Sequence, residues 1–213
     1  MNNSDIFETI EDLYFNNKYE EVIDFWEKNK SNYSIDNKSE YYNKILEAVA
    51  TSYVETGMFD NSLKYVDKQI KQLEFLEIPI HEKEKKLRYY YLNKINIFSK
   101  LEKRATEYRT IWEYIQTYKN DKTFLELSNS LEMHFYKKYV VFNKYFRYLI
   151  LSLIIIAVLL HLSNISINNN LYNIYNVFSI IGIAWIVLNL ILPHLFKKYF
   201  LYGVRHFLRP RNK

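Results

Sequence analysis

The first 132 residues alternate between stretches with apolar residues at helical spacing and short polar breaks. Leu46, Val49 and Tyr53 recur three or four residues apart in one stretch, and Leu63 and Val66 do so in the next. This spacing places apolar side chains on one face of an α-helix. The predicted helices span residues 5–16, 19–30, 40–56, 61–75, 81–100 and 103–119, and a long helix begins at residue 122 and continues past residue 147.

Two strongly apolar segments follow. Residues 149–162 read LILSLIIIAVLLHL, and residues 177–196 read VFSIIGIAWIVLNLILPHLF. A bilayer core of ~30 Å is crossed by about 20 helical residues, and a buried helix of a water-exposed bundle normally keeps a polar stripe. Because neither segment has such a stripe, we predict a two-helix transmembrane hairpin with spans at about 145–163 and 174–196. The alternative interpretation is a pair of buried helices in a bundle.

The charges divide the chain into an acidic front and a basic rear. The net charge is +5, from 29 Lys and Arg against 24 Asp and Glu. Residues 133–213 contain ten Lys or Arg and no Asp or Glu, which leaves −5 on residues 1–132. Basic residues flank the apolar pair on both outer sides, while the connection between them has none, so both termini are expected on the cytoplasmic side of a membrane. The high usage of Asn, Lys, Ile and Tyr is typical of an A+T-rich genome, which favours a bacterial source and hence a bacterial cytoplasmic membrane.

These observations predict three regions. Residues 1–135 form a cytosolic helical domain, residues 136–196 the transmembrane hairpin, and residues 197–213 a basic cytosolic tail. The tail mixes basic and aromatic residues, a combination that also occurs in RNA-binding segments. Because the predicted span tethers it to a bilayer, we expect contact with anionic lipid and not with nucleic acid. The expected lipid contacts are Lys197, Lys198, Arg205, Arg209 and Arg211.

Within residues 1–132 the helices form pairs that repeat. The segment that opens at Tyr19, YEEVIDFWEK, resembles the one that opens 40 residues later at Phe59, FDNSLKYVDK. The clearest unit is 46–70, LEAVATSYVETGMFDNSLKYVDKQI, in which Gly57 marks the turn and Ser62 occupies the point where two helices cross closely. This unit, at about 44–79, resembles a tetratricopeptide repeat (TPR), and two degenerate units, one on each side of it, extend the resemblance to roughly 5–119. It implies an all-α fold, a TPR-like solenoid of helical hairpins followed by the long helix and the transmembrane hairpin.

The sequence offers no catalytic, cofactor or metal motif. Cysteine is absent, three isolated glycines cannot form a phosphate loop, and the five histidines lack helical ligand spacing. The three Gly and three Pro also argue against an all-β fold and a nucleotide-binding α/β fold and favour an all-α chain. We therefore expect no enzyme activity, no cofactor and no metal.

The TPR resemblance implies a surface, formed by the first helix of each pair, that binds peptides or extended segments of a partner protein. The candidate partner-binding residues are Lys44, Glu47, Thr51, Val54 and Glu55 in the clearest unit, and Tyr90 and Lys94 in the next. The acidic balance of residues 1–132 favours a partner segment that is basic or neutral. The predicted function is a membrane-anchored adaptor that recruits a protein to a membrane complex. The alternative is an immunity or inhibitor protein whose hairpin binds a membrane-acting toxin.

Overall fold

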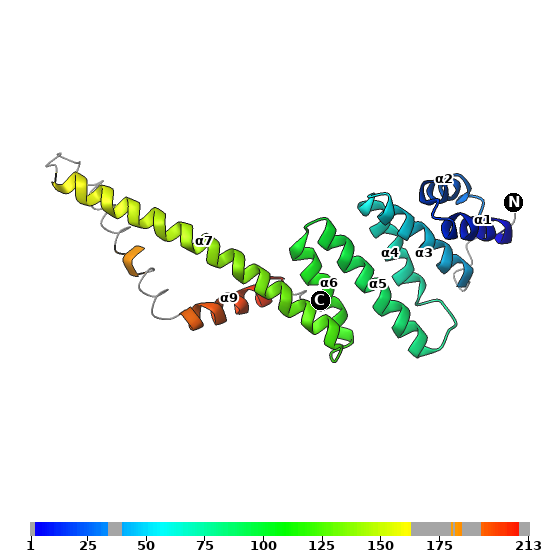
Figure 1. Ribbon diagram of the computed structural model, residues 1–213. Coiled ribbons are helices and arrows are strands. Elements are labelled where there is room, and N and C mark those ends of the chain that lie inside the picture. Colours follow the sequence, from blue (N-terminus) through cyan, green and yellow to red (C-terminus); the bar gives the residue numbers. More distant parts are fainter. Residues whose placement is uncertain (1–2, 34–39, 163–179, 181, 185–192, 209–213) are drawn as a thin grey trace. The chain divides into compact units, whose positions relative to one another are not determined.

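The computed structural model describes residues 3–33, 40–162, 180, 182–184 and 193–208 (Figure 1). All the secondary structure in these ranges is helical, and the chain divides into two compact units, residues 1–121 and 122–213. The first unit contains α1 (Asn3–Phe15), α2 (Tyr19–Asn29), α3 (Glu40–Glu55), α4 (Phe59–Gln72), α5 (Ile80–Lys100) and α6 (Arg104–Thr117). The second contains α7 (Lys122–Leu162) and α9 (Pro193–Leu208).

The predicted all-α class and the predicted helices of the front part are confirmed. Each helix begins and ends within about one turn of its predicted limits. The long helix from residue 122 is also confirmed, because α7 continues without a break into the first apolar segment. Helical periodicity and the short polar breaks were sufficient to locate all of these elements.

The first unit consists of three successive hairpins, α1–α2, α3–α4 and α5–α6, and all three turns have the same backbone geometry. The central turn residue has a positive φ in each case: 58° at Asn17, 77° at Gly57 and 55° at Glu102. The next residue's N–H donates to a carbonyl five residues earlier, at 3.0, 2.8 and 3.0 Å respectively. This is the bonding of a Schellman helix end, in which a left-handed residue reverses the chain. The structure therefore repeats the same turn three times, although only the second turn contains a glycine.

The core of the first unit lies between these hairpins. Helix α3 packs against α1, α2 and α4, and α4 packs against α5. Ile6, Val22, Leu46, Val49 and Tyr90 are among its most deeply buried side chains. The inward faces of helices from all three hairpins are thus covered by their neighbours.

In the second unit α9 runs antiparallel to α7. Phe200 stacks on Tyr139 with ring centroids 4.5 Å apart, and Arg205 pairs with Glu132 further towards the start of α7. Gly182 lies so close to α7 that a Cβ there would fall 2.5 Å from Cγ2 of Ile150. The absence of a side chain at position 182 is therefore required for this approach.

The predicted transmembrane hairpin is wrong. Within the residues that the structure describes, no helix combines the length and the apolar character needed to cross a membrane. The charges of Lys144 and Arg147 lie within α7, and the stretch of α7 after Arg147 is shorter than the ~20 apolar residues of a span. Most of the segment predicted as the second span, 174–196, lies outside the described residues. The predicted integral location in a bacterial cytoplasmic membrane, with both termini cytoplasmic, depended on this hairpin and is wrong as well.

Candidate functional site: a groove between α3 and α5

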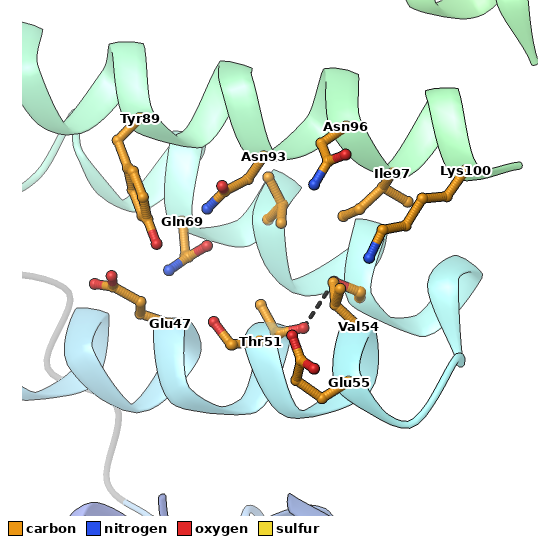
Figure 2. Close-up of a pocket in the computed structure, with 13 residues that line it drawn as sticks. Glu47, Thr51, Val54, Glu55, Gln69, Tyr89, Asn93, Asn96, Ile97 and Lys100 are labelled. Carbon is orange, nitrogen blue, oxygen red and sulfur yellow. Dashed lines mark hydrogen bonds between the residues drawn. The ribbon is translucent and has the colours of Figure 1, made fainter. Parts of the chain in front are cut away.

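A groove with a cavity of about 170 Å³ lies between α3 and α5, with α4 as its floor (Figure 2). We call it the α3–α5 groove. From α3 it is lined by Glu47, Ala50, Thr51, Val54 and Glu55; from α4 by Ser62, Val66 and Gln69; and from α5 by Tyr89, Asn93, Asn96, Ile97 and Lys100. Three helices from two adjacent hairpins therefore contribute to one site.

The helical repeat explains why these side chains meet. Glu47, Thr51 and Glu55 are separated by four residues each, so they form one row along α3. Leu46 and Val49 on the other side of the same helix are completely buried in the core, which directs the polar row towards α5. Figure 2 shows Glu47 on α3 opposite Tyr89 on α5 at one end of the groove. Glu55 and Lys100 lie at the other end.

Ser62 allows the floor to approach the wall. It is fully buried, and its Oγ donates a 2.8 Å hydrogen bond to the carbonyl oxygen of Ala50 on α3. Two small residues at this crossing let the two helix backbones come close together. The sequence prediction that Ser62 marks a close crossing agrees with this contact.

Gln69 is the exceptional residue of the floor. Its side chain is only 1% exposed, and its Nε2 has no hydrogen-bond partner. A buried amide without a partner costs about 1–3 kcal/mol, because the group has lost its water and gained nothing in exchange. In Figure 2 the Gln69 amide lies beside the Glu47–Tyr89 pair, next to the hydroxyl end of Tyr89. The groove thus contains a polar group whose bonding capacity is unused in the free protein.

The groove has two acidic side chains and one basic one. Lys100 Nζ lies 5.5 Å from the ring centroid of Phe59, at the end of the groove that also contains Glu55. At the other end, burial raises the pKa of the Tyr89 hydroxyl, a hydrogen bond from Asn93 opposes this, and the Glu47 carboxylate raises it further. The Tyr89 hydroxyl is therefore held in its neutral form beside a carboxylate.

The predicted partner-binding residues divide into two groups. Glu47, Thr51, Val54 and Glu55 line the groove together. Lys44 is exposed but does not line it, whereas Tyr90 is 1% exposed and accepts a hydrogen bond from Asn43.

Lys94 also lies outside the lining and forms a 2.8 Å ion pair with Asp67. The residues of α5 that do line the groove were not predicted; they include Asn93 and Asn96, two polar residues within this helix. Those two asparagines were the available signal.

A second, wider cavity of about 510 Å³ adjoins the α5–α6 hairpin. It is lined by His81, Glu84, Lys85, Arg88, Tyr114, Tyr118, Lys119, Asn120 and Asp121. The charged groups at its centre are engaged with one another: Asp121 Oδ2 accepts from Arg88 Nε at 2.8 Å and from the Tyr114 hydroxyl at 3.3 Å. Burial, followed by the nearby Asp121, raises the pKa of Tyr114 to about 12. This arrangement stabilises the end of the hairpin.

The residues predicted to contact lipid lie in different environments. Arg205 forms a two-pronged ion pair with Glu132, with Nε to Oε1 at 2.9 Å and Nη2 to Oε2 at 2.8 Å. Lys197 Nζ lies 5.5 Å from the ring centroid of Tyr136, while Lys198 is exposed. Arg209 and Arg211 lie outside the described residues.

Comparison with protein-family models, with curated proteins and with solved structures gave no match to this chain. Within the described ranges, no group of three or more His, Cys, Asp or Glu side chains is arranged to hold a metal ion. Any function must therefore be argued from the groove and its residues.

Proposed function

We propose that residues 1–121 form a TPR-like protein-interaction module, and that the α3–α5 groove binds an extended segment of a partner polypeptide. The observation that carries this proposal is the unpartnered, buried amide of Gln69 in a groove lined by further amides. Extended polypeptide offers carbonyl and N–H groups at regular intervals, and side-chain amides can donate to one and accept from the other.

Three features support an extended peptide over a small metabolite. The groove runs along two helices and is bordered by side chains on both sides, so it matches a linear ligand. Its polar groups are spread along its length and do not converge on one point, as they would in a catalytic site. The same three-hairpin arrangement also provides a rigid support, because each helix that lines the groove is packed on its opposite face.

The proposal concerns binding alone. Recruitment to a membrane was part of the predicted adaptor function, and the immunity alternative required the transmembrane hairpin. Because the prediction of that hairpin is wrong, we propose neither recruitment to a membrane nor an immunity function. The absence of enzyme activity stays a prediction.

The proposal is tested by blocking the groove. Thr51 is half-buried at the middle of the row on α3, so Thr51→Arg places a long side chain across the site. Thr106→Arg, at an exposed position on α6, introduces the same residue away from the groove. Phage-displayed random linear peptides are selected on the full chain, and the enriched peptides are then measured against both variants.

We expect Thr51→Arg to weaken binding of these peptides at least about tenfold, equivalent to about 1.4 kcal/mol, and Thr106→Arg to leave it unchanged. Circular dichroism establishes that both variants are folded. If the wild-type chain enriches no peptide, or if Thr51→Arg binds the selected peptides as well as Thr106→Arg does, the proposal is wrong.

A further inference from the structure

The charges along the α3–α5 groove are not evenly balanced. Glu55 and Lys100 are at the same end of the groove, so that end carries one negative and one positive group. Glu47 lies two helical turns from Glu55, about 12 Å along the helix axis. This distance exceeds the Debye length of ~8 Å at physiological ionic strength, so Lys100 compensates Glu47 only weakly.

Three further cations on α3 and α5 are engaged elsewhere or lie outside the groove lining. Lys86 Nζ lies 3.3 Å from Glu40 Oε1, and Lys94 Nζ lies 2.8 Å from Asp67 Oδ1. Lys44, one turn before Glu47, is exposed and does not line the groove. Among the described residues, no ion pair involves Glu47. The carboxylate therefore faces the groove without a counter-charge.

Tyr89 stands directly across from this carboxylate (Figure 2). Its side chain is 44% exposed, which leaves part of the ring accessible from the groove. A carboxylate beside an open aromatic ring suits a cation, because the ring face attracts positive charge and the carboxylate pairs with it. Arginine fits best, since its planar guanidinium stacks on a ring and bonds a carboxylate at the same time.

The amide of Gln69 lies beside this pair, and it supplies a second, independent reason to place a ligand there. It is buried and its Nε2 lacks an acceptor. The nearest group that an extended peptide with a basic side chain at Glu47 could offer it is a backbone carbonyl of that same peptide. A single bound residue would then give the Glu47 carboxylate, which accepts a hydrogen bond from Tyr89, a counter-charge and would give the Gln69 amide an acceptor.

On these grounds we propose that the groove selects its partner by one Arg or Lys side chain, which binds between Glu47 and Tyr89 while Gln69 donates a hydrogen bond to the adjacent peptide carbonyl. This inference rests on the proposed function and makes it more specific: the partner segment is basic at one fixed position, and acidic or neutral side chains there are excluded.

The test compares two neutralising substitutions on the same helix. Glu47→Gln removes the proposed cation-binding charge while keeping the shape of the side chain, and Glu55→Gln removes the same charge from the other end of the groove. The probes are peptides selected on the full wild-type chain, together with copies in which each Arg or Lys is replaced in turn by Gln.

We expect the selected peptides to share a basic residue at one position, and its replacement by Gln to weaken binding about tenfold, or about 1.4 kcal/mol. Glu47→Gln should cause a similar loss and should bind the original and the Gln-substituted peptide equally, whereas Glu55→Gln should still bind the original peptide about tenfold more tightly than the Gln-substituted one. In a second selection, Glu47→Lys should enrich peptides with Asp or Glu at the same position.

The outcomes separate the two proposals. Peptides that bind the wild type, lose binding with Thr51→Arg, and show no preference for a basic residue would overturn the cation site and leave the proposed function intact. Equal binding of the original and the Gln-substituted peptide by Glu55→Gln would overturn it as well, because the basic residue would then not be recognised by Glu47 alone. If no peptide is enriched, both proposals fail together.

Discussion

The hydroxyl of Tyr65 on α4 donates a 2.7 Å hydrogen bond to Oε1 of Glu27 on α2, and so joins the first hairpin to the second. The same carboxylate oxygen accepts from the Tyr53 hydroxyl at 3.1 Å, and Tyr65 in turn accepts from Trp26 Nε1 at 3.0 Å. Tyr53 and Tyr65 stack with ring centroids 5.5 Å apart. This connected group fixes the hairpin that carries one wall of the groove.

Tyr65→Phe is expected to destabilise the chain by about 1–3 kcal/mol. The substitution keeps the ring but deprives Trp26 Nε1 of its acceptor inside the core, and a buried donor without a partner carries a cost of that size. Tyr41→Phe is the matched control, because Tyr41 is 59% exposed and should change stability by less than about 0.5 kcal/mol. Urea denaturation of both variants provides the measurement. Equal stability of the two would show that the Tyr65 hydroxyl contributes nothing.

Stability should decline in acid through Glu27. Burial on its own would raise the pKa of Glu27, but hydrogen bonds from Lys30, Tyr65 and Tyr53 outweigh it and lower the pKa below its ordinary 4.5. A carboxyl whose pKa is depressed by folding stabilises the protein above its unfolded pKa, and this contribution is lost as the pH falls through the folded value. The difference in unfolding free energy between wild type and Glu27→Gln should therefore shrink below pH 4.5. A difference that is the same above and below that pH would contradict the assignment.

The repeated turn geometry makes opposite predictions for two residues. Gly57 has a φ of 77°, and a Cβ there would meet nothing within 4 Å, so the cost of Gly57→Ala is conformational and should be about 1 kcal/mol. Glu102 holds the same left-handed conformation with a side chain, so Glu102→Gly should stabilise the chain by up to about 1 kcal/mol. Thermal denaturation compares them. Destabilisation by both would mean that Glu102 makes a contribution beyond its backbone.

Loss of the Arg205–Glu132 pair should loosen the second unit. Glu132 is 3% exposed, so Arg205→Ala would leave a buried carboxylate without its guanidinium. Since Arg205 itself is partly exposed, we expect about 2 kcal/mol, less than a fully buried pair would lose. Lys198→Ala, at an exposed position of the same helix, is the control. Hydrogen exchange of the α9 amides should accelerate in Arg205→Ala and stay unchanged in Lys198→Ala; unchanged exchange in both would contradict the role of the pair.

The sequence was sufficient for the helices because each one has a clear apolar face and a polar break on either side. It could not show that Asn17 and Glu102 repeat the turn of Gly57, since neither residue is a glycine and the backbone conformation leaves no other sign. The second hairpin was recognised as a repeat for the opposite reason: Gly57, Phe59 and Ser62 are all present.

The candidate site was found in part. The TPR resemblance implied Glu47, Thr51 and Glu55, and helical spacing places these three residues in one row that lines the groove. On α5, Tyr90 was predicted where its neighbour Tyr89 lines the groove; an error of one residue turns a side chain by about 100° around a helix, here from the groove into the core. Gln69 could not be predicted, because its burial depends on contacts between three helices.

The prediction of a transmembrane hairpin had another cause. It rested on apolar composition and on basic residues at the flanks, and it counted residues before Arg147 towards the length of the first span. In the structure α7 starts at Lys122, so Lys144 and Arg147 lie within the helix that continues into the apolar stretch. Hydropathy alone does not distinguish a transmembrane span from an apolar stretch at the end of a longer helix that carries charges.

The central claim is that the α3–α5 groove binds an extended polypeptide segment. Its most direct test is the affinity of peptides selected on the full wild-type chain, measured for Thr51→Arg and for Thr106→Arg under identical conditions. The account predicts at least about a tenfold loss for Thr51→Arg and none for Thr106→Arg. Equal affinity of the two variants for those peptides would contradict it.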